Sequence, residues 1–147
     1  MAEFTIREGT EKDFPAVLEM IKELAEFEKS PEKVTNTIER MKQDKDFFHL
    51  LIAEDGSGKA VGFALFFPAY FTWTGRAVYL DDVYVKPAYR GKGIGTALIK
   101  RVIEKAKEWG ATRVRWHVLN WNTNAIELYK KLGAEISDEW LMCEVWL

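Results

Sequence analysis

The spacing of apolar residues in the first third of the chain predicts one short strand followed by two helices. Residues 4–7 alternate between apolar and polar side chains, as a strand with one buried face does. Thr10, with Asp13 three residues later, forms a capping-box-like helix start, and the helix that follows is apolar on one face until Glu28. A serine N-cap followed by a proline predicts a second helix over residues 30–43.

Short apolar runs in the rest of the chain predict strands separated by turns and by two more helices. The runs 48–53 and 61–68 flank a glycine-containing turn and form a predicted hairpin, and an aromatic loop covers residues 69–75. Further strands are expected at 77–85, 113–119 and 140–147, and helices at 94–109 and 123–132, which Gly110 and Gly133 end. This order predicts a single α/β domain over residues 1–147, with a central mixed sheet and helices on both faces.

The most unusual stretch of the chain is a basic, glycine-rich turn after the strand 77–85. Three glycines alternate with other residues between Arg90 and Thr96, at the start of the helix 94–109. A main chain without side chains can surround an anion with its N–H groups, and the helix dipole adds to the attraction. Arg90 and Lys92 bring two positive charges to the same place. The turn is therefore predicted to bind a pyrophosphate group.

Two common phosphate motifs do not fit this turn. A P-loop requires Ser or Thr directly after a Gly-Lys pair, and the residue after Lys92 is Gly93. A dinucleotide fingerprint requires a third glycine where Thr96 stands. The remaining alternative is an ordinary strand-to-helix turn with glycine caps. It is disfavoured, because arginine and lysine inside a glycine-rich turn suit few purposes other than anion binding.

Two segments of the chain resemble signatures of the GNAT N-acetyltransferases. Residues 82–96 resemble the acetyl-CoA-binding signature, whose core [RQ]-x-x-G-x-[GA] corresponds to residues 90–95. Residues 121–134 resemble the second signature, N-x-x-A-x-x-x-Y-x-x-x-G. Within the superfamily, residues 21–28 and 79–82 are similar to the diamine acetyltransferases, which include spermidine/spermine and thialysine enzymes. The resemblance covers nearly the whole chain.

The resemblance implies the GNAT fold, with a mostly antiparallel sheet, and acetyl-CoA as the cofactor. In that family a bulge separates the signature strand from its neighbour, and the pantetheine fills the gap as an additional strand would. Main-chain N–H groups of residues 91–96 are expected to bind the pyrophosphate, and Asn122 or Asn124 the cofactor arm. The residues expected at the cofactor are Val83, Tyr84, Val85, Arg90, Gly91, Lys92, Gly93, Ile94, Gly95, Thr96, Asn122, Asn124, Ala125 and Tyr129.

Acetyl transfer from a thioester to an amine requires a neutral amine and a proton for the departing thiolate. The resemblance implies that Tyr129 is the proton donor, since a phenol with a pKa near ~10 matches a thiol near ~8.5. Asp81 or Asp82 can receive the amine proton through water. Neighbouring strand residues point to opposite faces, so only one is expected at the acceptor. The resemblance selects Asp81, which matches a glutamate in the diamine enzymes, and Asp82 is expected to fix local structure or to bind a cation from the far side.

The acceptor site is expected around three residues that match the polyamine site of the diamine enzymes. These are Phe27 and Glu28, at the end of the first helix, and Trp73 in the aromatic loop, since a carboxylate near an aromatic ring suits an alkylammonium. A solvated helix end and a loop anchor are the structural alternatives. Phe71 stands where mammalian-type enzymes carry an acidic residue, which favours a short diamine or a lysine-like amine over spermine. Arg115 would repel a cation if it faced the site.

These residues predict an acetyl-CoA-dependent N-acetyltransferase that acts on a small diamine, polyamine or lysine-like amine by direct transfer. One alternative keeps the chemistry and changes the acceptor to a protein N-terminus or lysine side chain. Another is a non-catalytic acetyl-CoA sensor, which the presence of Tyr129 and Asp81 disfavours.

The composition limits the partners and the cellular compartment that are expected for this chain. The formal net charge of −2 favours neither nucleic acid nor an anionic membrane as a partner, and no apolar run reaches membrane length. Cys143 is the only cysteine, so a reducing, cytoplasmic compartment is expected, and its apolar surroundings predict a buried, inert thiol. His49 and His117 stand far apart without cysteine partners, and no metal site is expected. The apolar last strand, by analogy with the diamine enzymes, predicts a homodimer.

Overall fold

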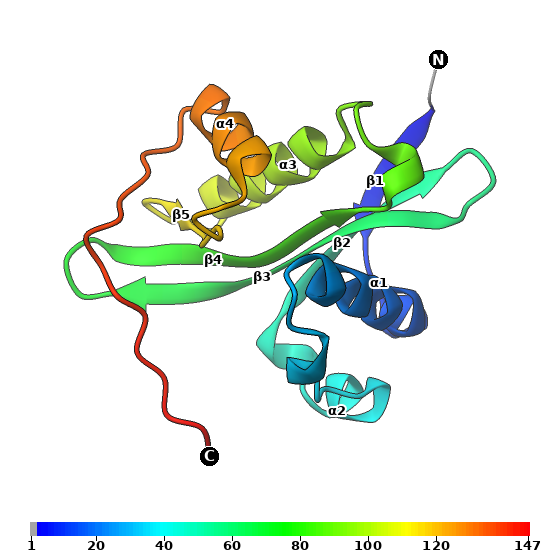
Figure 1. Ribbon diagram of the computed structural model, residues 1–147, viewed down its shortest axis with the longest axis horizontal. Coiled ribbons are helices and arrows are strands. Elements are labelled where there is room, and N and C mark those ends of the chain that lie inside the picture. Colours follow the sequence, from blue (N-terminus) through cyan, green and yellow to red (C-terminus); the bar gives the residue numbers. More distant parts are fainter. Residues whose placement is uncertain (1–2) are drawn as a thin grey trace. The chain divides into compact units, whose positions relative to one another are not determined.

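The computed structural model describes residues 3–147, which form two compact units divided after His117 (Figure 1). The first unit contains the sheet and the helices packed on it, and the second contains one helix and the C-terminal segment. In chain order the elements of the first unit are β1 (Phe4–Glu8), α1 (Phe14–Phe27), α2 (Ile38–Gln43), β2 (His49–Asp55), β3 (Ala60–Phe71), β4 (Gly75–Val85), α3 (Ile94–Glu108) and β5 (Val114–Arg115). The second unit contains α4 (Thr123–Lys131).

The sheet has the order β1-β2-β3-β4-β5, in which β4 and β5 are parallel and the other neighbours are antiparallel. Helices α1 and α3 cover opposite faces of it (Figure 1). Phe63 of β3 is fully buried in the cluster under α1, whereas the neighbouring Gly62 and Phe66 face Leu98 and Trp109, which belong to α3 and its C-cap. The predicted mixed, mostly antiparallel sheet with helices on both faces is confirmed.

A charged cluster fixes the point where α1 begins. The main-chain N–H of Thr10 donates to the Asp13 carboxylate at 2.8 Å, which completes the predicted capping box. Arg7 of β1 donates to both oxygens of Asp13, at 2.6 and 2.8 Å, and lies 3.0 Å from Glu54 of β2. We call these three residues the Arg7–Asp13–Glu54 cluster. Its hydrogen bonds tie the first strand, the helix start and the second strand together.

A β-bulge interrupts β4 where it approaches the end of its pairing with β5. Asp82 pairs with Leu65, but Leu80 pairs with the next residue of β3, so that Asp81 is the extra residue. The parallel ladder with β5 has only two pairs and ends at Tyr79. Beyond Tyr79 the two strands are no longer paired, which is the separation that the resemblance implied.

Three predicted elements are shorter than expected. The second helix begins only after Thr37, whose side chain accepts a hydrogen bond from the Arg40 N–H, because the main chain is extended at Val34 and at Thr37. The aromatic loop shrinks to residues 72–74, since β3 and β4 extend to a tighter hairpin. Strand β5 covers two residues instead of residues 113–119, because its only partner strand bulges away.

The predictions for the C-terminus were wrong. Residues 140–147 form no strand, because residues 118–147 contain no second strand to pair with them. Their side chains are exposed, with Leu141 at 90% and Trp146 at 77%. Cys143 is likewise exposed rather than buried, since the segment packs into no core. Gly133 does end α4 as predicted, with a positive φ of 89°.

Candidate active site

The glycine-rich turn has the main-chain geometry of an anion-binding site. Gly91 and Gly93 have φ values of 77° and 83°, in the left-handed region, and Gly93 is the N-cap of α3. A Cβ atom added to either glycine would meet no atom within 4 Å, so the space in front of the main chain is open. Successive N–H groups in this conformation, followed by a helix N-terminus, form a concave donor surface. Residues 91–96 therefore fit the diphosphate of a coenzyme.

The two basic side chains of this turn lie against aromatic rings. Arg90 donates through Nε to the Val85 carbonyl at 2.9 Å, and its guanidinium lies 5.4 Å from the ring centre of Tyr84. The ammonium of Lys92 lies 5.4 Å from the ring centre of Tyr89. Arg90 also lies 6.0 Å from the ring centre of Phe27, the last residue of α1. This contact joins the predicted cofactor turn to the helix end that was predicted to bind the acceptor.

The edge of β4 beside this turn is open to an extended ligand. Val83 and Val85 pair with β3 on one side and are half-buried, while the ladder with β5 ends four residues before Val83. Main-chain groups on this edge suit a chain that runs alongside as an added strand. The resemblance places the pantetheine here, and the observed separation of the strands is compatible with it.

Three carboxylates gather on the α1 face of the sheet at the bulge, and we call them the bulge carboxylates: Glu28, Asp81 and Asp82. Alternation along β4 was expected to put the two aspartates on opposite faces, but the bulge removes that alternation, and both interact electrostatically with Glu28. Within residues 3–117 no lysine or arginine forms an ion pair with any of them. The sequence did not reveal this convergence, because a bulge leaves no reliable pattern in a single sequence.

The surroundings of these three carboxylates raise their pKa values. Loss of hydration, together with the neighbouring charges of Asp81 and Glu28, raises the pKa of Asp82 to about 7. Loss of hydration also raises the pKa of Glu28, with a further contribution from Asp81. The pKa of Asp81 is raised by the same loss of hydration and lowered by His117. Carboxylates in this state gain from the arrival of a cation, and one of them can accept a proton near neutral pH.

Two polar residues beside the bulge were not among the predicted site residues. The Tyr79 hydroxyl and His117 Nδ1 form a hydrogen bond, and Tyr79 stacks on Phe67 with the ring centres 5.3 Å apart. Loss of hydration and the charge of Asp81 raise the pKa of Tyr79, which keeps its hydroxyl protonated. His117 follows the short β5, so its place beside Tyr79 depends on the parallel register of β4 and β5. The sequence contains no signal for that register, so it could not reveal the pair.

The structure separates Trp73 from the other predicted acceptor residues. Trp73 lies at the tip of the β3–β4 hairpin and is exposed. The hairpin end at Gly75 and the bulge at Asp81 lie six residues apart, or roughly 20 Å at about 3.3 Å per residue. Glu28, by contrast, is brought to the bulge by α1. Of the predicted acceptor residues in the first unit, Glu28, Asp81 and Asp82 therefore come together, and Trp73 does not join them.

The remaining predicted residues lie in the second unit. Asn122 is the N-cap of α4, and its side-chain oxygen accepts a hydrogen bond from the Ala125 N–H at 3.3 Å. Asn124 stands in the first turn of this helix and Tyr129 in its second half. The amide of Asn122 therefore has a structural role at the helix start, which the sequence analysis did not include.

Other parts of the molecule do not compete as the amine site. A cavity of about 520 Å³ lies at the β1–β2 edge, where its lining includes His49, Trp109 and Lys105. Lys105 is paired with Glu8 at 2.7 Å and Lys45 with Glu11 at 3.2 Å, so lysines of the cavity already compensate two of its three carboxylates. Within residues 3–147 no group of three or more His, Cys, Asp or Glu residues could hold a metal ion. No helix among these residues is long and apolar enough to cross a membrane.

Comparison with known proteins identifies the family. The model of the acetyltransferase (GNAT) family matches residues 14–134. The thialysine N-epsilon-acetyltransferase of Sus scrofa is 46% identical over 145 residues, covering 91% of this chain and 85% of the relative. The spermidine/spermine N(1)-acetyltransferase-like protein 1 of Homo sapiens is 36% identical over 147 residues, covering 92% of this chain and 21% of the relative.

Solved structures agree on the fold. An acetyltransferase of Clostridium acetobutylicum, solved with acetyl-CoA, superposes with a TM-score of 0.79 at 22% identity, covering 97% of this chain and 96% of that one. The anion-binding turn, the open edge of β4 and the matched family model are consistent with one another. The chain therefore belongs to the GNAT acetyltransferase family and is an N-acetyltransferase that uses acetyl-CoA.

Proposed function

We propose that the acceptor is a primary alkylamine of a small diamine, a polyamine or a lysine-like molecule. The observation that carries this proposal is the set of bulge carboxylates, whose pKa values are raised by loss of hydration, which form no ion pair with a lysine or arginine of residues 3–117, and which lie where β4 separates from β5. An alkylammonium supplies the missing charge. The names of relatives that acetylate thialysine and L-ornithine, and of one that is like the spermidine/spermine acetyltransferases, agree with this class.

The bulge carboxylates prepare the amine for reaction. An alkylamine with a pKa near ~10.4 is charged at neutral pH and must lose a proton before it can act as a nucleophile. Asp81 is the exposed member of the set and takes this proton, directly or through water, while Asp82 and Glu28 hold the ammonium in place. Removal of the proton by a positioned carboxylate is general base catalysis.

Acetyl-CoA supplies an activated acetyl group. The main chain of residues 91–96 holds its diphosphate, with Arg90 and Lys92 adding charge, and the open edge of Val83 and Val85 holds its pantetheine. Tyr129 holds the proton that the departing thiolate requires, and Asn124 contributes to binding the cofactor arm. The assignments of Tyr129 and Asn124 rest on the family signature at residues 122–133.

A pair of glycine variants tests the cofactor turn. Gly93 and Gly58 have nearly the same φ, 83° and 85°, and a Cβ atom would meet nothing within 4 Å at either. Gly93→Ala and Gly58→Ala therefore carry the same main-chain strain, and only the first puts a methyl group beside the predicted diphosphate. Calorimetry should show acetyl-CoA binding weakened about 10- to 100-fold in Gly93→Ala, the size of one charge-assisted hydrogen bond, and unchanged in Gly58→Ala. Equal affinities would show that residues 91–96 are only a turn.

The acceptor class is tested by release of free CoA with a panel of amines. Diamines, lysine and thialysine should be acetylated, whereas peptides with a free N-terminus or an internal lysine should react poorly. Tyr129→Phe should lower kcat by about 10²–10⁴ with little change in acetyl-CoA affinity. A preference for the peptides would favour protein acetylation, and tight acetyl-CoA binding without any turnover would favour a sensor.

We further propose a homodimer in the cytoplasm. The exposed apolar side chains of Leu141, Val145 and Trp146 favour a contact with a second copy, and the single cysteine favours a reducing compartment. Light scattering after size-exclusion chromatography should give twice the mass of the chain. Removal of residues 140–147 should give the mass of one chain, and a monomeric full-length protein would contradict the proposal.

A further inference from the structure

Two arginines lie on the α1 face of the sheet, on the other side of Tyr79 from the bulge carboxylates. Arg115 is paired in register with Tyr79, and Arg113 precedes it by two residues, so both share the face of Tyr79. The guanidinium carbons of Arg115 and Arg113 lie 3.9 and 4.8 Å from the ring centre of Phe71. We call this arrangement the Arg113–Phe71–Arg115 cluster.

No acidic side chain of the first unit forms an ion pair with the two arginines of this cluster. Within residues 3–117 no aspartate or glutamate forms an ion pair with Arg113 or Arg115. Arg113 Nε is buried without a hydrogen-bond partner, although buried polar groups in proteins nearly always have one. Stacking on Phe71 orients both guanidiniums and leaves their N–H groups to bind something else. Two unpaired guanidiniums are unfavourable neighbours for the second ammonium of a diamine.

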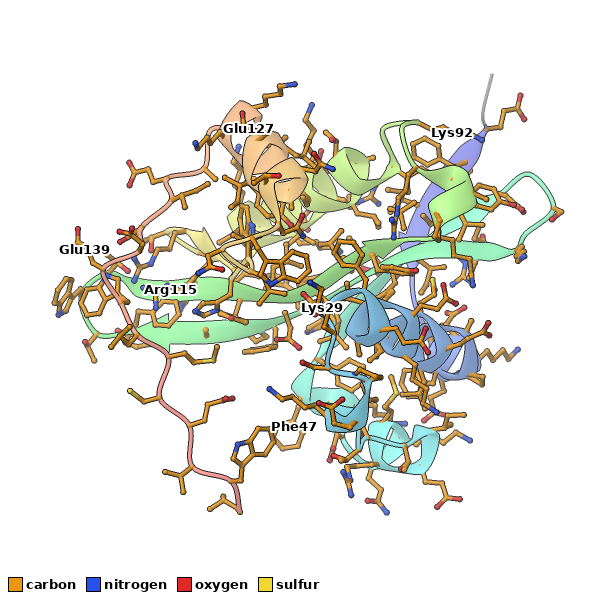
Figure 2. The ribbon with its side chains drawn as sticks, in the orientation of Figure 1. Lys29, Phe47, Lys92, Arg115, Glu127 and Glu139 are labelled. Atoms are coloured by element: carbon orange, nitrogen blue, oxygen red, sulfur yellow. The ribbon has the colours of Figure 1, made fainter. Side chains whose placement is uncertain are left out.

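The same face therefore has an acidic end and a basic end. Tyr79 lies between them and interacts electrostatically with Asp81, Asp82 and Arg115. In Figure 2, Arg115 lies toward the β3–β4 hairpin, whereas Lys29, the neighbour of Glu28, lies over the middle of the sheet. A ligand that fits this face carries a positive charge at one end and a negative charge at the other.

The distance between the acidic end and the basic end of this face limits the length of the ligand. Tyr79, which is level with Arg115, lies about 7 Å from Asp81 along β4, as two residues of strand do. The path from the terminal nitrogen of lysine to its carboxylate carbon contains as many bonds as two residues of main chain. Extended lysine therefore spans about the same length, which is about 7 Å. Arg115 leans toward Phe71, away from Asp81, and this leaves room for a hydrogen bond of about 2.9 Å at each end.

We propose that the Arg113–Phe71–Arg115 cluster binds the carboxylate of an amino-acid acceptor whose side-chain amine lies at the bulge carboxylates. This inference rests on the proposed function, because it assigns the other end of the same acceptor. Phe71 carries no charge that could attract a second ammonium, and its ring instead supports two guanidiniums. The acceptor class is then a zwitterionic amino acid of the size of ornithine, lysine or thialysine.

Two pairs of acceptors that differ only in the carboxylate test the subsite. Ornithine is compared with 1,4-diaminobutane and lysine with 1,5-diaminopentane, by release of free CoA. In the unaltered enzyme each amino acid should have the higher kcat/KM. Arg115→Met should raise KM for the amino acids about 10- to 100-fold, as loss of a charge-assisted hydrogen bond does, and should leave KM for the diamines unchanged or lower. Lysine amide should behave as the diamines do.

Two further variants control the experiment. Arg115→Lys keeps the charge but loses the paired N–H groups, so it should restore only part of the affinity for the amino acids. Arg101→Met removes an exposed arginine from α3, on the other face of the sheet, and should change no KM. Acetyl-CoA affinity and the melting temperature of Arg115→Met show that the variant is folded.

The outcomes separate the two proposals. If Arg115→Met changes kcat/KM for amino acids and diamines by the same factor, or if the unaltered enzyme prefers the diamines, the carboxylate subsite is wrong while the proposed function stands. If no amine is acetylated, the proposed function is wrong. Calorimetry of lysine and 1,5-diaminopentane binding to the unaltered enzyme and to Arg115→Met then decides the subsite by itself, because equal affinities in both proteins would exclude it.

Discussion

The first unit contains two clusters of charged residues in which the surroundings of a carboxylate have opposite effects on its pKa. In the Arg7–Asp13–Glu54 cluster, the carboxylate of Asp13 is buried and receives hydrogen bonds from Arg7 and from the main chain of Thr10. These hydrogen bonds, above all those from Arg7, lower the pKa of Asp13. Among the bulge carboxylates, Asp82 has no such partner, and loss of hydration raises its pKa to about 7.

The difference lies in where the compensating charge comes from. A buried charge that the chain itself compensates stabilises the fold, because the attraction is present whenever the protein is folded. Carboxylates crowded together without a cation repel each other in the folded state and attract a cationic ligand. The two clusters therefore distinguish charges that the chain itself compensates from charges that, in our proposal, bind the substrate.

The largest expected effect concerns activity. Asp81→Asn should lower kcat/KM for an amine acceptor by about 10²–10⁴, the usual loss when a general base is removed. The loss should diminish toward high pH, since an amine with a pKa near ~10.4 then loses its proton unaided. The measurement is CoA release between pH 6 and 10, and Asp13→Asn is the matched control, which should keep its kcat/KM. A loss in Asp81→Asn that is independent of pH would remove Asp81 from this role.

A second variant tests the structural cluster. Asp13→Asn should destabilise the fold by about 2–3 kcal/mol, less than a fully buried ion pair because the Arg7 side chain is 38% exposed. The melting temperature should fall by about 5–10 °C. Since the folded pKa of Asp13 is lowered, its contribution is present above its ordinary pKa and is lost as the pH falls through the folded pKa. A deficit that persists undiminished in strong acid would contradict this account.

The smallest expected effect is a gain in stability rather than a loss. The folded pKa of Asp82 is raised, so its contribution to stability is complete below its ordinary pKa of 3.8 and is lost as the pH rises through about 7. Asp82→Asn should therefore melt about 2–4 °C higher than the unaltered protein at pH 8 and at nearly the same temperature at pH 4. Saturation of the unaltered protein with a diamine should reduce the difference. A variant that is less stable at pH 8 would place Asp82 with the structural charges.

The parts of the fold that depend on local patterns were predictable from the sequence. The period of α1, the capping box at Thr10 just before it and the glycines that end helices are signals carried by a few neighbouring residues. The glycine-rich turn before α3 was predictable for the same reason, since Gly91 and Gly93 act through their own main chain, and its role in anion binding stays a prediction. These features do not require knowledge of which strands become neighbours.

The features that were missed depend on strand pairing. The resemblance implied a bulge in this strand, but that the bulge brings Asp81 and Asp82 together follows only from the ladder with β3, and the early end of β5 depends on where β4 leaves it. The meeting of Tyr79 with His117, and of Phe71 with Arg115, likewise requires the register of three strands. The apolar run 140–147 has the composition of a strand, but composition does not provide a strand to pair with.

The extra residue in β4 limits how acceptor preference can diverge among descendants of this enzyme. Exchange of one side chain at 81 or 82 alters charge and reach while the strand keeps its path. Loss of Asp81 itself would make Leu80 and Asp82 direct neighbours, and each could keep its present partner in β3, because those partners are already adjacent. The side chains on both flanks, Tyr84 in the core beneath α1 among them, would keep their faces, and the segment would lose one carboxylate and its bulge together. Substitution at 81 or 82 can thus change the charge of this segment in small steps, whereas loss of the extra residue would change its charge and its shape at once.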